Sequence, residues 1–113
     1  MNAFFVAFPQ ITATEKPVIA LASGDTLSLT CFTSGNPSPQ IEWLKDGQRN
    51  YSRAKLSRND TILSISHVKP GDSGNYSCIA RNAVGIAMHS TIVTVFCKYI
   101  YIYCLFYHFS FII

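Results

Sequence analysis

A chain of 113 residues has room for one domain of ordinary size. Hydrophobic residues make up 49% of the chain, which is enough for a packed core, and charged residues make up only 13%. The net charge of +3 is mild and lacks the clustered basic residues of a nucleic-acid-binding protein, so no nucleic-acid partner is expected. Four cysteines occur, none in a C-x-x-C pair, so a zinc site has no support and no other cofactor is indicated.

The first ten residues, MNAFFVAFPQ, resemble a secretory signal only weakly. Their apolar run is short, no basic residue precedes it, and no A-x-A-like cleavage site follows. An incomplete start of the chain would explain these missing features. Pro9 and Pro17 bracket the next segment, and proline within a strand fits only an edge strand. We therefore expect residues 1–8 to be an N-terminal extension and the folded domain to begin near residue 9.

After that segment the chain reads as short strands separated by turn residues. DTLSLTC alternates between apolar and polar residues and places Leu27, Leu29 and Cys31 on one face. The cluster SGNPSP predicts a turn, because no helix would tolerate it. QIEWLK alternates again, with Ile41 and Trp43 inward, and ends at the dipeptide DG. That dipeptide favours the positive φ angles of a tight hairpin turn.

The second half of the chain continues this pattern. TILSIS and NYSCIA each alternate, and the four residues NAVG predict a hairpin between NYSCIA and the final strand. The inward positions predicted in this half are Leu63, Ile65, Val68, Tyr76, Cys78, Ala80, Val93 and Val95. We find no helical period and no internal repeat. Regularly spaced short strands with one buried face each predict an all-β sandwich.

Three of the inward residues, Cys31, Trp43 and Cys78, fall on different strands, and Tyr76 lies two residues before the second cysteine. The wide gap between the two cysteines suits a disulfide that closes a long loop. With this set of residues the chain resembles the immunoglobulin fold. GNPSPQIEWLKDG, LSISHVKPGDSGNYSC and ARNAVG are similar to I-set domains, which occur in adhesion and guidance receptors, matrix proteins and muscle proteins. The resemblance covers roughly residues 9–96 and implies a two-sheet antiparallel sandwich with Greek-key connections.

The resemblance also implies roles for side chains of the core. Cys31 and Cys78 would form the disulfide that joins the two sheets, with Trp43 packed against it. Tyr76 would direct its hydroxyl at a backbone carbonyl in the turn before it, which satisfies a buried polar group. Leu63 would belong to the same core.

Asp72 matches a residue that, in I-set domains, pairs with a basic residue near the start of strand D. Arg53 is the first candidate for that salt bridge in this sequence, and Lys55 is the second. The alternative is a solvated carboxylate, and an exposed pair would contribute only about 0–1 kcal/mol.

The stretch GDSG, which contains Ser73, also looks like the nucleophile loop of a trypsin-like serine protease. Such an enzyme needs a histidine base and a buried aspartate that orients it. His67, His89 and His108 each lie outside any motif, and Asn-Tyr follows GDSG where the protease family has Gly-Pro. We therefore predict that Ser73 is a turn residue and that the protein is not an enzyme.

Three N-glycosylation sequons occur, at Asn50, Asn59 and Asn75. The alternation of NYSCIA turns Asn75 outward, as glycosylation requires, and Asn59 falls in a predicted turn between two strands. Together with the cysteine pair, the sequons favour an oxidising setting, outside the cell or at its surface.

A basic segment lies between residues 45 and 58, where five basic residues face a single acid, Asp46. The segment predicts a contact for an acidic partner such as heparan sulfate, or else it is an ordinary solvated region. The basic residues of this segment are Lys45, Arg49, Arg53, Lys55 and Arg58.

Two classes of function compete. The first is an extracellular recognition or cell-adhesion module that binds a protein partner, homophilically or heterophilically, as part of a multi-domain receptor or matrix protein. The second is a cytoplasmic structural module of a muscle-type protein, in which the cysteines would stay reduced. The sequons and the complete Cys–Trp–Cys set favour the first.

The tail FCKYIYIYCLFYHFSFII follows the last predicted strand, so we place residues 97–113 outside the domain. One interpretation is the start of a membrane anchor, although its uncharged run has 15 residues where a span needs about 20. A second is a loose apolar strand, which would aggregate in water. A third is translated intron, because thirteen of the 18 residues are Phe, Ile, Tyr or Lys, types that AT-only codons can encode. In that case the natural protein continues into further domains, and the state of Cys97 and Cys104 stays open.

Overall fold

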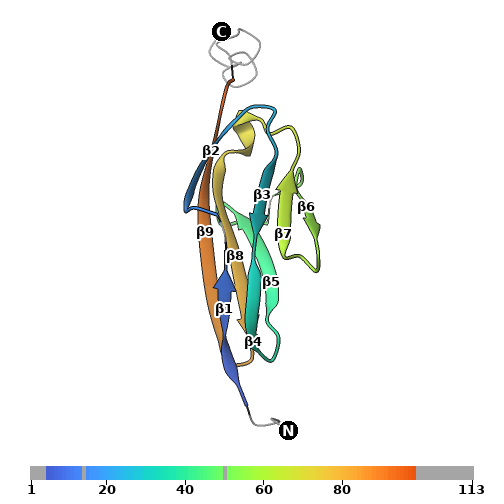
Figure 1. The fold of residues 1–113 in the computed structure, drawn as a ribbon, viewed down its shortest axis with the longest axis vertical. Helices are drawn as coiled ribbons and strands as arrows, with labels where there is room; N and C mark the ends of the chain where they lie inside the picture. Colours follow the sequence, from blue (N-terminus) through green and yellow to red (C-terminus); the bar gives the residue numbers. More distant parts are fainter. Residues whose placement is uncertain (1–4, 14, 50, 99–113) are drawn as a thin grey trace.

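The computed structural model describes residues 5–13, 15–49 and 51–98, and these form a sandwich of β-strands (Figure 1). One short 3-10 turn, η1 (Pro70–Asp72), precedes the eighth strand. The strands are β1 (Ala7–Thr12), β2 (Val18–Ala22), β3 (Leu27–Thr30), β4 (Phe32–Asn36), β5 (Gln40–Lys45), β6 (Lys55–Ser57), β7 (Ile62–Ile65), β8 (Gly74–Asn82) and β9 (Gly85–Phe96). No helix in the described ranges is long and apolar enough to cross a membrane.

The strands lie in two layers. One layer is the four-stranded sheet β2-β9-β8-β5. The other holds the sheet β3-β7-β6 and the pair β1-β4, because β3 and β4 follow one another along one line with only Cys31 between them (Figure 1). The predicted all-β immunoglobulin-like sandwich is confirmed. Its strand pairs are antiparallel as predicted except β2–β9, which is parallel because the first segment changes layers after β1.

The first segment is the edge that its prolines predict. β1 pairs only with β4, and its register shifts between Ala7 and Gln10, around Pro9, which has no N–H to donate to a ladder. Asn82 holds this edge in place, because its side-chain N–H donates to the carbonyl oxygens of Ala7 (2.8 Å) and Pro37 (3.0 Å). This amide therefore ties β1 to the end of β8 and to the loop between β4 and β5.

The inward residues predicted from alternation form the core. All except Ile41 are buried, and Ile41 packs against the core while partly exposed. Ser77 and Ile79 are also buried, although they face the other side of the sheet. They lie on β8, which has β5 on one side and β9 on the other, so neighbouring side chains cover both of its faces.

Two of the predicted hairpin turns are present. Lys45 and Gln48 exchange backbone hydrogen bonds of 2.7 and 3.0 Å around Asp46 and Gly47, whose φ angles of 52° and 80° fit the mirror-image turn that DG favours. The chain that follows this turn pairs with β5 only through the Lys45–Gln48 β-bridge and then leaves it. The second hairpin joins β8 to β9, with Asn82 and Gly85 as its closing pair.

Candidate protein-interaction surface

The disulfide lies at the centre of the sandwich. The structure joins Cys31 to Cys78 with their Cα atoms 6.4 Å apart, and both residues are fully buried. Trp43 is the cross-strand partner of Cys78 in the β5–β8 pair, so its ring lies beside the bridge. Its indole N–H donates to the carbonyl oxygen of Asp60 at 2.8 Å, which satisfies the one polar atom of the ring.

Tyr76 occupies the corner that the sequence predicts. Its hydroxyl donates to the backbone oxygen of Asp72 at 2.6 Å, within the buried region. Burial, together with the negative charges of the nearby Asp72 and Asp46 carboxylates, raises the pKa of Tyr76 to about 12. The hydroxyl therefore stays protonated and keeps its hydrogen bond well above neutral pH.

The Asp72 side chain is buried, and both of its carboxylate oxygens accept hydrogen bonds. One carboxylate oxygen accepts a hydrogen bond from the Arg53 side chain at 2.8 Å, and the other accepts the backbone N–H of Lys69 at 2.8 Å. Arg53 also donates to the carbonyl oxygen of His67 at 3.0 Å. The structure thus brings together the first candidate pair and leaves Lys55 exposed on β6.

Ser73 has the geometry of a structural residue. Its hydroxyl oxygen accepts the backbone N–H of Val95 at 2.8 Å and so holds β9 against the start of β8. Among the described histidines, His67 contributes its carbonyl to Arg53, and the ring nitrogen Nε2 of His89 is buried without a hydrogen-bond partner. Neither histidine is hydrogen-bonded to Ser73, and His108 lies outside the described residues.

The five basic residues of segment 45–58 differ in their partners. Arg49 pairs with Glu42 and Arg53 pairs with Asp72, and both acids lie outside the segment. Lys45 donates to the carbonyl oxygen of Gly71 at 2.9 Å. Lys55 and Arg58 remain exposed, so the positive charge available to an acidic partner is smaller than the sequence suggests. A heparan-sulfate contact stays a prediction.

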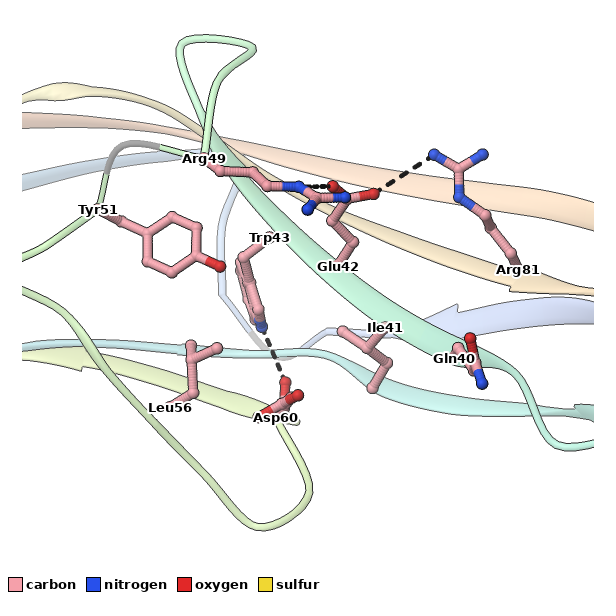
Figure 2. Close-up of a pocket in the computed structure, with 9 residues that line it drawn as sticks. All are labelled: Gln40, Ile41, Glu42, Trp43, Arg49, Tyr51, Leu56, Asp60 and Arg81. Atoms are coloured by element: carbon pink, nitrogen blue, oxygen red, sulfur yellow. Dashed lines mark hydrogen bonds and ion pairs between the residues drawn. The ribbon is translucent and has the colours of Figure 1, made fainter.

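A hollow follows the free edge of β5 (Figure 2). On its rim the carboxylate of Glu42 contacts Arg49 and, at 3.4 Å, Arg81. The hydrogen bond from Arg49 holds the pKa of Glu42 below its usual value. Tyr51 and Trp43 line the opposite part of the hollow, so it combines an ionic rim with an aromatic wall. Its residues are Gln40, Ile41, Glu42, Trp43, Arg49, Tyr51, Leu56, Asp60 and Arg81.

The four-stranded sheet has an outer face, directed away from the core, that is unusually apolar. Four of its side chains are more than half exposed: Val18 (59%), Ile86 (62%), Met88 (63%) and Ile92 (52%). We call the side chains that point this way the outer face: Val18, Ala20, Ala22, Gln40, Glu42, Leu44, Asn75, Ser77, Ile79, Arg81, Ile86, Met88, Ser90, Ile92, Thr94 and Phe96. Charge occurs only at the end that holds Glu42 and Arg81.

The outer face contains two apolar groups separated by a polar pair. Ile86 and Met88 form the first group, beside the β8–β9 hairpin, and Ile92 and Val18 form the second. Ser77 and Ser90 lie between the groups and share a hydrogen bond of 2.8 Å between their hydroxyl oxygens. The inward alternation did not predict this face. The signal was present in IAMHSTIVTVF, where apolar residues also occupy outward positions.

The sequons differ in their surroundings. Asn75 is exposed on the outer face, and Asn59 is exposed in the turn between β6 and β7, where its φ is +58°. Its neighbours Arg58 and Asp60 also have positive φ angles, of 52° and 65°. Asn50 and the tail from residue 99, which includes Cys104, lie outside the described residues, and Cys97 is half-buried just beyond β9.

Comparison with known proteins identifies the family. The family model described as "Immunoglobulin domain" matches residues 9–82. The chain belongs to the immunoglobulin domain family. Its relatives are I-set-containing adhesion receptors and titin immunoglobulin domains, which confirms the I-set resemblance, and the domain is non-catalytic.

The similar proteins are long. The chain is 45% identical over 73 residues to the neuronal cell adhesion molecule of Mus musculus, which is 64% of this chain and 6% of that protein. It is 40% identical over 75 residues to fibroblast growth factor receptor homolog 1 of Drosophila melanogaster, which is 65% of this chain and 10% of that protein. The chain therefore spans about a tenth or less of these relatives.

Solved structures give the same fold in two kinds of protein. The structure "Sidekick-1 immunoglobulin domains 1-4" superposes with a TM-score of 0.74 at 27% identity, covering 80% of this chain and 25% of that one. A chimeric titin Z1Z2 structure superposes with a TM-score of 0.73 at 26% identity, covering 84% of this chain and 100% of that one. The fold is thus shared with immunoglobulin domains of both titin and Sidekick-1.

Proposed function

We propose that this immunoglobulin domain is an extracellular recognition module of a multi-domain adhesion receptor or matrix protein, and that it binds a protein partner through the outer face. The observation that carries the proposal is the exposure of apolar side chains there, above all Ile86 and Met88. These two side chains lie two residues apart on the same face of β9, and an exposed apolar patch marks a site of interaction. The edge of charge at Glu42 and Arg81 supplies the polar rim that such interfaces have.

Three observations support an extracellular setting. The structure contains a buried disulfide, and disulfides persist in oxidising compartments. Two described sequon asparagines are exposed. The relatives that match at 40% identity or more over about two thirds of the chain include proteins named as a neuronal cell adhesion molecule and a growth factor receptor homolog. The competing proposal, a cytoplasmic structural module, is supported by the likeness to titin domains alone.

The proposal is tested by a binding screen of the secreted chain, produced behind a cleavable leader, against cell-surface ectodomains that include its own. The decisive variant is Met88→Glu, which places a charge in the first apolar group. The matched control is Ser28→Glu, which places the same charge on an exposed position of β3, in the opposite layer. We expect Met88→Glu to weaken binding at least tenfold, roughly the 1.4 kcal/mol of one contact residue, while Ser28→Glu changes it little. Equal binding by both variants would refute the assignment of the face.

A further inference from the structure

The position of Asn75 within the sheet determines which side chain lies nearest to it. Its backbone N–H donates to the Asp46 carboxylate at 2.8 Å and its carbonyl accepts the N–H of Asp46 at 2.8 Å, so both groups point toward the β5 side. Toward β9, Asn75 and its register partner Ile92 therefore form a pair without hydrogen bonds between them. In an antiparallel sheet this is the pair whose side chains lie closest.

Ile92 continues the row toward the next strand. Its backbone N–H donates to the carbonyl oxygen of Pro17 at 2.8 Å, and its register partner on β2 is Val18. Asn75, Ile92 and Val18 thus stand side by side across three strands, and all three are exposed. The row pairs an amide that begins a sequon with the second apolar group of the outer face.

The other residues of this sequon indicate at which stage of folding Asn75 can be modified. Tyr76 is fully buried, and the Ser77 hydroxyl is hydrogen-bonded to Ser90. A transferring enzyme that must bind this hydroxyl therefore needs the segment before β8 pairs with β9. The Asn75 side chain is exposed, so folding can leave a carried group in solvent.

We infer that Asn75 carries an N-linked glycan whose first sugars lie over Ile92 and Val18. The amide nitrogen of Asn75 forms a bond to the anomeric carbon of an oligosaccharide carried on a lipid diphosphate. The bond from that carbon to the diphosphate breaks, the lipid diphosphate leaves, and the amide proton passes to a base of the transferring enzyme. The C–H face of the first sugars then covers apolar surface that would otherwise meet water.

This arrangement divides the outer face between two occupants. The glycan covers the second apolar group, Ile92 and Val18, and the protein partner is restricted to the first group, Ile86 and Met88, beyond the serine pair. The inference rests on the proposed extracellular setting. It can fail independently, because a bare Asn75 would leave the effect of Met88→Glu on binding unchanged.

The test is the melting temperature and glycan occupancy of secreted chains in two backgrounds. Asn75→Gln is made in the natural background and in one carrying Ile92→Thr and Val18→Thr, which keep β-branched residues at exposed positions. Asn59→Gln, which removes a sequon far from this row, is the matched control. We expect peptide mapping to find glycan on Asn75. We expect Asn75→Gln to lower the melting temperature by about 4 °C in the natural background and by less than about 1 °C in the threonine background.

Two outcomes would overturn the inference: a bare Asn75, or an equal loss of melting temperature in both backgrounds. Nuclear Overhauser contacts between the first sugar and the methyl groups of Ile92 give a readout that does not depend on stability. Their absence from a glycosylated chain would equally contradict the placement of the sugar.

Discussion

The two faces of the four-stranded sheet carry opposite chemistry, although the same strands build both. On the inner face every signature group is occupied: Cys78 is bonded to Cys31 of the opposite layer, the Trp43 indole N–H has an acceptor, and the Tyr76 hydroxyl has another. On the outer face four large apolar side chains are more than half exposed, and Met88 is 63% exposed. The inner face therefore accounts for the family, and the outer face is where a function particular to this chain would lie.

Among substitutions that compare the two faces, Trp43→Ala on the inner face should have the largest effect on stability. The substitution removes a buried ring beside the disulfide and leaves the carbonyl of Asp60 without its donor, so it should lower the free energy of unfolding by about 3–5 kcal/mol. Denaturant titration measures the change. Leu44→Ala, at the next position of β5 but on the outer face, should cost far less. A Trp43→Ala chain of unchanged stability would break the comparison.

A smaller loss of stability is expected from substitution of Asp72, in the 3-10 turn before β8. Asp72→Ala removes the acceptor of both Arg53 and the Lys69 N–H, and it should cost about 2 kcal/mol. Urea unfolding measures this loss. Arg53→Gln is the companion variant. Because the Arg53 side chain is 42% exposed and can reach water, its loss should be smaller than that of Asp72→Ala. Equal stability of Asp72→Ala and the natural chain would contradict a structural role for this pair.

A pH dependence should distinguish Tyr76 from exposed tyrosines. The folded pKa of about 12 lies above the unfolded value of about 10, so the stabilisation is complete below pH 10. It is lost as the pH rises from 10 toward 12, because the unfolded tyrosine ionises first. Melting temperatures measured from pH 8 to pH 12 should decrease as the pH rises from 10 toward 12. The decrease should be smaller in Tyr76→Phe. That variant should cost about 1 kcal/mol at neutral pH. Identical alkaline profiles would show that Tyr76 is not responsible.

The smallest effect on stability is expected on the outer face. Met88→Ser should change the free energy of unfolding by no more than about 0.5 kcal/mol, because the side chain is already in contact with water. Thermal unfolding checks this value. A loss of several kcal/mol would mean that Met88 supports the fold, and the outer face could not then be assigned to recognition.

The sequence predicted the inner face well for a physical reason. Side chains alternate along a strand, so burial on one side appears as a period of two, and Val93 and Val95 on β9 follow it. The pair of Asp72 with Arg53 came from the family resemblance, because 19 residues separate them and no local pattern joins them.

Alternation along single strands could not predict other features of the structure. The parallel pair β2–β9 depends on where the chain changes layers, and Ile79 is buried only because β8 is an inner strand of its sheet. The basic segment looked continuous in the sequence, yet Arg49 pairs with Glu42 across the edge of β5. Long-range partners decide charge and burial at these positions, and a single sequence does not display them.

The most direct test of the division between the faces is to measure affinity and stability on the same Met88→Glu chain. Surface plasmon resonance with the partner found in the screen gives the first quantity, and thermal unfolding gives the second. We expect binding at least tenfold weaker with a melting temperature within about 3 °C of the natural chain. Unchanged affinity at an unchanged melting temperature would contradict it.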